Sequence, residues 1–362
     1  MNQSQLWALL SNTSLVSGEE PAAGELDSPW YISVLMGFLG WLAALFLLGF
    51  VGFGIFSVIE SKVASFIVGI LMIGGAYLLL QKNQAIFAEY FSLAISLAGQ
   101  VLVLWSLLES SGAESRFFWL AMMVLQISIA ALMLGAVHRV FSAYFACFAF
   151  IAFLILSGAQ NIGVSIILFG VVWLWLNEFR YTQYMAQIRT MGYGLVLALI
   201  SIKGALITST SSSFWWGYNR QPEIWIQPWV GQLLSGFVLL YLVWGLRHQS
   251  SSAISQWSNR LIMRVYFAVA LIAAISFEAP GIIIGVAILL LGFAGSNRVL
   301  TGLGCVSLLL YISAYYYQLH NTLLDKSLSL LALSIVLLGC RYCLNRRANS
   351  RRHEASEGTS HE

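Results

Sequence analysis

Charged side chains are scarce in this sequence. Asp, Glu, Lys and Arg make up 9% of the 362 residues, whereas hydrophobic residues make up 59%. A soluble domain has about 25% charged residues, because polar side chains must cover its apolar core. Lipid as the solvent removes that requirement. The composition therefore excludes a soluble globular fold and predicts an all-α, polytopic transmembrane helical bundle.

Several functional classes lack their usual signatures. The formal net charge of +3 is too small to indicate a nucleic-acid partner. The sequence contains no Walker A, HExxH or GxSxG motif, and its five histidines are scattered along the chain. We therefore expect no enzyme activity and no catalytic residue. We also expect no metal, no cofactor and no bound nucleic acid.

Cysteine and basic residues are missing where a secreted protein would need them. None of the four cysteines falls in a hydrophilic loop, so no disulfide framework is expected. Residues 1–29 contain no Lys or Arg and therefore lack the basic start of a cleaved signal peptide. We expect 1–29 to be a polar cytoplasmic segment, 30–344 a multi-span membrane domain, and 345–362 an Arg-rich disordered cytoplasmic tail.

Long apolar runs are what the chain does contain. A span needs about 20 apolar residues to cross the hydrocarbon core. We expect about 12 spans, with a range of 10 to 12. The runs lie at 31–55, 63–80, 87–108, 117–137, 140–157, 161–176, 191–209, 229–246, 261–277, 281–296, 299–317 and 327–344.

Two of these boundaries depend on short turns. Residues 140–177 contain no Asp, Glu, Lys or Arg, and this apolar run is too long for one membrane crossing. Ser157-Gly158-Ala159-Gln160-Asn161 in its middle indicates a tight turn between two short helices. Glu278-Ala279-Pro280 indicates a second turn.

The distribution of Lys and Arg predicts the orientation. With 12 spans and a cytoplasmic C-terminus, thirteen Lys and Arg lie inside and four lie outside. Both termini then face the cytoplasm, and the localisation is a bacterial-type cytoplasmic (inner) membrane. The acidic N-terminal segment leaves an eleven-span arrangement with an outer N-terminus open.

Few polar residues enter the spans. Gln100 and Gln126 lie mid-span on neighbouring helices, where they can hydrogen-bond each other. Lys203 lies past the midpoint of its span, where an unpaired charge costs about 2.5–3.5 kcal/mol. We expect it to face the bundle interior, with Glu278 as its first-choice partner. Snorkelling to the outer headgroups and a role in a solute or proton path stay open.

A second candidate region lies at the outer rim around residues 311–327. Its tyrosines can place their hydroxyls in the headgroup region, and Asp325 and Lys326 can open the last helix. We expect a fixed structural corner there. The tyrosines are Tyr311, Tyr315, Tyr316 and Tyr317. The candidate functional residues are Lys203, Glu278, Asp325, Lys326 and Tyr316.

Two stretches resemble a known family. The first is Ser28-Pro29-Trp30-Tyr31 followed by Gly37-x-x-Gly40-Trp41-Leu42-Ala43-Ala44-Leu45-Phe46. The second is Tyr315-Tyr316-Tyr317-x-Leu319-x-x-Thr322-Leu323-Leu324-x-Lys326-Ser327. The chain is similar, from about 28 to 344, to bacterial integral membrane proteins described as the domain of unknown function DUF4401. This resemblance implies a second membrane domain beside or fused to the family, and a small partner with a Gly-Asp-Tyr motif. It implies no reaction.

Two functional classes stay open. The first is a non-enzymatic assembly or sensing partner of another envelope protein, slightly favoured by short loops and by the absence of carboxylates at mid-depth in any span. The second is a permease for a small or lipid-like solute, favoured by the number of spans and by Lys203. The expected partners are the lipid bilayer and a possible second membrane protein.

Overall fold

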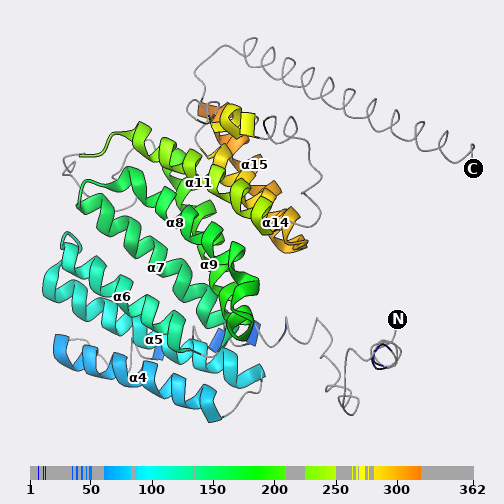
Figure 1. The fold of residues 1–362 in the computed structure, drawn as a ribbon. Coiled ribbons are helices and arrows are strands. Elements are labelled where there is room, and N and C mark those ends of the chain that lie inside the picture. Colours follow the sequence, from blue (N-terminus) through cyan, green and yellow to red (C-terminus); the bar gives the residue numbers. More distant parts are fainter. Residues whose placement is uncertain are drawn as a thin grey trace, which may run out of the picture. The chain divides into compact units, whose positions relative to one another are not determined.

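The computed structural model describes residues 61–82, 86–133, 135–208, 225–249 and 281–318, with single positions among 7–50 and 263–276. Within these residues the chain is helical and contains no strand (Figure 1). The helices are α4 (Lys62–Lys82), α5 (Ile86–Ser111), α6 (Arg116–Leu132), α7 (Ala136–Leu156), α8 (Gln160–Leu176), α9 (Met185–Thr208), α11 (Pro228–Gln249), α14 (Ile282–Ala294) and α15 (Arg298–Gln318). Two short 3-10 helices, η1 (Glu178–Arg180) and η2 (Thr182–Tyr184), join α8 to α9.

These helices coincide with nine of the predicted spans. Six of them are long and apolar enough to cross a membrane, and α6, α8 and α14 are shorter apolar helices. The all-α prediction is confirmed for the described residues, and six such helices indicate a membrane protein. The count of 12 is not established, because most residues of the predicted spans 31–55, 261–277 and 327–344 lie outside the described part. The same holds for the predicted tail 345–362.

The predicted turn within 140–177 is confirmed. Helix α7 ends at Leu156 and α8 begins at Gln160. Gly158 has a φ of 73°, in the left-handed region that glycine occupies without steric cost. The backbone N–H of Ala159 donates to the carbonyl of Leu154 over 2.9 Å, which closes the last turn of α7.

The predicted boundary between 117–137 and 140–157 is wrong. We placed it at the polar pair His138-Arg139, but α6 ends at Leu132 and α7 already begins at Ala136. Met133 is extended and ends α6, and Gly135 lies so close to the Glu89 side chain that a Cβ there would be 3.2 Å from its carboxylate. The break therefore occurs where two helices approach closely. His138 and Arg139 lie in the first turn of α7.

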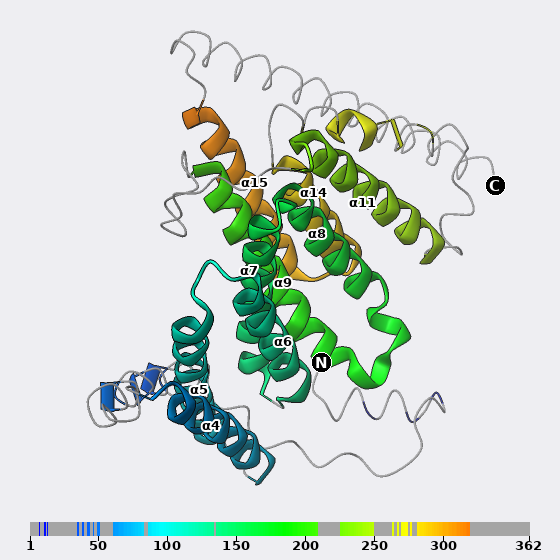
Figure 2. The ribbon, with the colours of Figure 1, turned by 90° about the vertical axis from the view of Figure 1, so that its left-hand side faces the viewer.

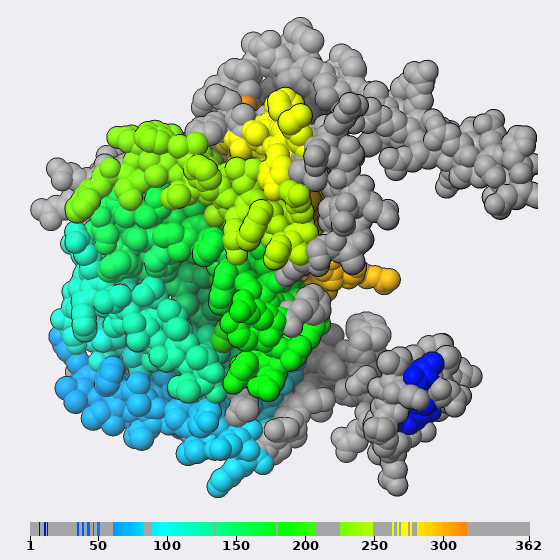
Figure 3. Space-filling view, in the orientation of Figure 1, coloured from blue at the N-terminus to red at the C-terminus, as the bar shows by residue number. Residues whose placement is uncertain are grey.

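The chain divides into two compact units, residues 1–149 and 150–362, with the boundary inside α7. In the first unit, α4 and α5 are antiparallel neighbours that pack through glycines. A Cβ at Gly99 would lie 2.6 Å from the carbonyl oxygen of Gly69, so the two backbones are almost in contact. Helix α6 closes this unit, since Ile129 and Met133 form one buried cluster with Ala76 and Leu80 of α4. Figure 3 shows α4 as the blue outer edge of the unit.

In the second unit, α8 lies against α9 and α11, and α14 forms a hairpin with α15 (Figures 1 and 2). Glycine again sets the spacing. A Cβ at Gly304 of α15 would lie 2.7 Å from the Leu289 backbone of α14. Near the other end of the hairpin, a Cβ at Gly285 would lie 2.7 Å from the Leu308 side chain. Close packing by small residues, as membrane helices use it, is thus the role of these glycines.

Large apolar side chains cover much of the outer surface of the described helices. Phe66, Ile67 and Leu71 of α4 are exposed, as are Phe237 of α11 and Leu309 of α15. A water-soluble protein of this size rarely exposes contiguous apolar faces, whereas lipid solvates them. The surface therefore agrees with the composition in indicating a membrane environment.

Candidate functional site

A cavity with a partly polar wall lies within the second unit, among apolar helices. Its volume is about 270 Å³. Side chains from α8, α9 and α11, with Ser276 and the start of α14, form its wall. The lining residues are Gln160, Asn161, Val164, Ser165, Lys203, Leu206, Pro228, Gly231, Gln232, Ser235, Ser276, Gly281, Ile283 and Ile284. We call this cavity the Lys203 pocket.

The parallel pair α8 and α11 builds one wall of the Lys203 pocket. Asn161 donates from Nδ2 to the carbonyl of Ile226 over 2.6 Å, and Ser165 donates to the carbonyl of Gly231 over 2.7 Å. The hydroxyls of Ser165 and Ser235 are 2.9 Å apart. Gly231 permits this approach, because a Cβ there would overlap the carbonyl oxygen of Asn161. These bonds fix the start of α11 against the start of α8.

Lys203 lines the pocket from α9. Within the described residues, no hydrogen bond or ion pair joins its ammonium to another side chain, and most of its surroundings are protein atoms. The sequence predicted that Lys203 faces the bundle interior, and the structure places it, partly buried, in the wall of a cavity of the second unit. Its predicted partner, Glu278, lies outside the described residues, so that pairing stays a prediction.

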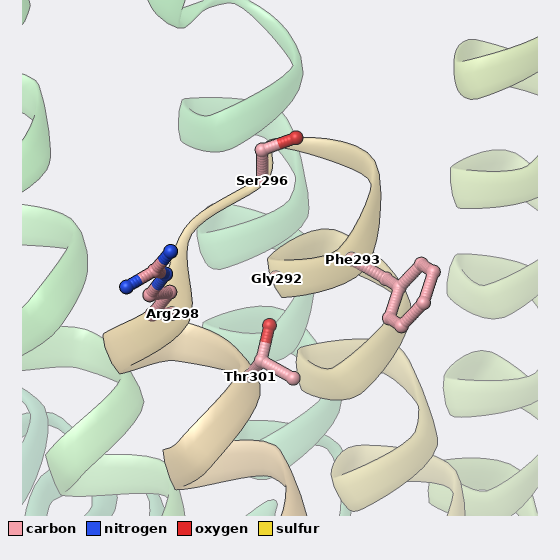
Figure 4. A pocket seen from close by; sticks show the side chains of 5 residues that line it. All are labelled: Gly292, Phe293, Ser296, Arg298 and Thr301. Carbon is pink, nitrogen blue, oxygen red and sulfur yellow. The ribbon is translucent and has the colours of Figure 1, made fainter.

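A second depression lies at the turn between α14 and α15. It measures about 370 Å³ and is lined by Gly292, Phe293, Ser296, Arg298 and Thr301. Figure 4 shows Arg298 and the Phe293 ring pointing to opposite sides of the turn, with Thr301 between them. Phe293 is 80% exposed, so this depression faces the surroundings. We attribute it to the shape of the turn, where Gly292 packs against the Thr301 backbone.

The predicted interfacial position of Tyr311 is wrong. Tyr311 is 1% exposed, and its hydroxyl lies 3.5 Å from the carbonyl oxygen of Leu199, at the outer limit of a hydrogen bond. Its ring fills the space left by Gly281, since a Cβ there would lie 2.9 Å from the ring. Tyr316 is partly buried near the end of α15 and does not line the Lys203 pocket. Asp325 and Lys326 lie outside the described residues.

The predicted pair of glutamines in the first unit is confirmed. Gln126 of α6 donates from Nε2 to Oε1 of Gln100 over 2.8 Å, and Gln100 donates to the Ser96 hydroxyl over 3.1 Å. Both glutamines are buried. This network joins α5 to α6 and gives the pair a structural role.

Replacing one glutamine of this pair leaves the other buried without its hydrogen-bond partner. Single and double replacements should therefore lower the free energy of unfolding by different amounts. We expect Gln100→Leu to lower the free energy of unfolding by about 1–2 kcal/mol, since the buried Gln126 amide then lacks its acceptor. The double change to Leu at 100 and 126 should cost less than that. Denaturant titration in mixed micelles measures both. Equal losses in the single and double variants would contradict the role of this bond.

Sequence reasoning missed a buried polar group at the start of α7. His138, which lies between two predicted spans, is 1% exposed and hydrogen-bonds the backbone of Ser92. Arg139, expected in an inner loop, is 7% exposed. The Glu89 carboxylate lies near the same point, beside Gly135. The signal available in the sequence was Gly135, which marks the true helix boundary.

A buried ion pair was also missed. Arg189 of α9 donates to the Glu178 carboxylate of η1, and the Glu178 side chain is only 5% exposed. The sequence prediction counted Arg189 only among the thirteen cytoplasmic Lys and Arg residues and gave it no partner. In the structure α9 begins at Met185, so Arg189 lies one turn inside the helix.

Comparison with known proteins gives one family. Among the described residues, no group of three or more His, Cys, Asp or Glu is placed to hold a metal ion. No curated protein and no solved structure matches the chain. The model of a family described as a domain of unknown function, DUF4401, matches residues 29–347. This match covers most of the chain and agrees with the resemblance seen in the sequence, and the chain therefore belongs to the DUF4401 family.

Proposed function

We propose that this protein binds a small polar solute in the Lys203 pocket and carries it across the membrane, as a permease. One observation supports this: a cavity of about 270 Å³, inside a unit built of apolar helices, has Lys203 and several uncharged polar side chains in its wall. Polar and ionisable residues at membrane depth are costly, and they commonly mark a solute or ion pathway. Asn161, Ser165 and Ser235 have hydrogen-bond partners in the wall itself, whereas among the described residues no hydrogen bond or ion pair joins the Lys203 ammonium to another group.

The proposal includes a multi-pass topology of 12 spans in a cytoplasmic membrane, with both termini inside. It is supported by the nine helices that match predicted spans and by their directions. Gln160 at the start of α8, Pro228 at the start of α11 and Lys203 near the end of α9 line one cavity. The sequence assigns all three positions to the outer side. The partner role, slightly favoured by the sequence, stays a prediction that no contact in the described residues favours.

Access to the pocket tests the proposal, because a carrier must open its binding site to each side in turn. In a variant without the four native cysteines, we expect Ser235→Cys to react with a membrane-impermeant thiol reagent both in intact cells and in inside-out vesicles. Ser235 lines the pocket. The matched control is Leu239→Cys, one turn further along α11 at a residue 0% exposed, which should not react.

The outcomes separate the functional classes. Reaction of Ser235→Cys from both sides supports transport. Reaction from one side only would rule out a carrier. The pocket would then be a binding site open to one side of the membrane, which is what a sensing role requires. Reaction of Leu239→Cys at the same rate would show that the variants are loosely folded, and labelling would then be repeated in stabilised vesicles at lower temperature.

A further inference from the structure

Three helices begin at the Lys203 pocket. Gln160 is the first residue of α8, Pro228 is the first residue of α11, and Gly281 is the N-cap of α14, and all three line the cavity. Helices α8, α11 and α14 are mutual neighbours in the second unit (Figures 1 and 2). Their amino-terminal ends therefore converge on one partly open cavity.

Converging helix starts make this space electrically positive. The first four backbone N–H groups of a helix have no partner within it, and they give its amino-terminal end roughly half a positive charge. Neither α8 nor α14 begins with a side-chain cap that accepts a hydrogen bond from these groups. Helix starts at membrane depth bind anionic groups of solutes for this reason.

Lys203 adds to the same cavity an amine that carries a positive charge when it is protonated. No Asp or Glu stands among the described residues that line it, so the described wall carries no balancing negative charge. The amides of Gln232 and Gln160 supply further hydrogen-bond donors. A cavity of about 270 Å³ accommodates a phosphate or carboxylate group together with a small substituent.

We infer that the Lys203 pocket binds an oxyanion, either a phosphate or a carboxylate, between the Lys203 ammonium and the starts of α8 and α14. The inference deepens the proposed function by naming the chemical class of the ligand. It rests on the proposed function in one respect, that the bound oxyanion is the solute carried across the membrane. The oxyanion is either a free ion or the headgroup of a lipid, because both present the same charged oxygens. Burial of Lys203 is then balanced by the ligand.

The experiment uses the full chain purified in a phosphate-free maltoside detergent. Sodium phosphate and sodium acetate are titrated against sodium chloride of equal ionic strength, and a short-chain phosphatidylglycerol is titrated separately. We expect a saturable rise in melting temperature and saturable heat of binding with at least one oxyanion. Saturation with the free ions identifies a free solute, and saturation with the lipid alone identifies a headgroup; either result supports the inference.

The variants test where the oxyanion binds. Lys203→Gln should weaken binding by about 10- to 100-fold, the loss expected for one charge-assisted hydrogen bond, while Lys203→Arg should retain it. Gln232→Leu, a milder change in the same wall, should weaken binding by about 3- to 10-fold and serves if Lys203→Gln does not fold. The matched control is Lys62→Gln, which removes an exposed lysine of the first unit and should leave affinity unchanged.

Three results would overturn the inference: no saturable binding of any probe, unchanged affinity in both Lys203→Gln and Gln232→Leu, or binding that appears only in Glu278→Gln. The last result would show that Glu278 is the internal counter-ion of Lys203. These outcomes are distinct from failure of the permease proposal. If an oxyanion binds but Ser235→Cys reacts from one side only, the permease proposal is wrong and the oxyanion inference holds. If Ser235→Cys reacts from both sides but no oxyanion binds, the oxyanion inference is wrong and the permease proposal holds.

Discussion

Gly231→Ala should destabilise the protein more than any other single methyl group added to a described helix. The new Cβ would overlap the carbonyl oxygen of Asn161, which is backbone and cannot move without shifting α8. Helix α11 must then separate from α8, and the bond from Ser165 to the Gly231 carbonyl is lost with it. We expect the free energy of unfolding to fall by about 3 kcal/mol or more, the upper range for an overpacked core.

The matched control for this change is Gly302→Ala on α15. No atom lies within 4 Å of the position that its Cβ would take. Alanine favours a helix over glycine by about 0.5–1 kcal/mol, so this variant should be as stable as the parent or slightly more stable. Denaturant titration in mixed micelles measures both variants. A similar stability for the two would mean that α8 and α11 do not approach as closely as described.

Arg189→Gln should give the second large effect. Glu178 is 5% exposed and accepts from Arg189, so loss of the guanidinium leaves a buried carboxylate without its charged partner. Breaking a fully buried pair costs about 3–5 kcal/mol, and because the Arg189 side chain is 45% exposed we expect about 2–3 kcal/mol. Detergent melting and denaturant titration at neutral pH measure this loss.

A surface ion pair provides the comparison. Lys62 and Glu109 are 3.7 Å apart with side chains 48% and 54% exposed, and Lys62→Gln should cost only about 0–1 kcal/mol. The double change to Gln at 178 and 189 should recover most of the stability lost in Arg189→Gln, because it removes the buried charge as well. Losses of equal size at Arg189 and Lys62 would show that burial of Glu178 is unimportant.

Polar residues inside the membrane domain were predictable only when both partners were visible. Gln100 and Gln126 stand out from long apolar runs at matching depth, so their hydrogen bond was predicted and is present. Lys203 also stands out, and its inward position was predicted from the cost of an unpaired charge in lipid. The serines and amides around it were not predicted, because they come from α8 and α11, distant in sequence.

Helix boundaries were also predictable only where the residues that cause them are close together in the sequence. The turn at 157–159 was predicted from a local cluster of small and polar residues, and it is present. The break at 133–135 was not predicted, since His138 and Arg139 looked like loop residues. Their burial depends on Gly135, which brings the start of α7 against Glu89 of α5. A polar residue marks a loop only when no neighbouring helix shields it.

The sequence by itself determined that the described part of this protein is all-α, that its helices are apolar, and where nine of them lie. Run length, composition and turn residues are local properties, and lipid requires each span to satisfy its own backbone hydrogen bonds. The tertiary structure alone decided which faces meet: the burial of Tyr311 on Gly281, the Glu178–Arg189 ion pair, and the convergence of three helix starts on Lys203. Helices that are apolar on every side carry no stripe to show which face is inside. Their register is therefore set by contacts between residues far apart in the chain.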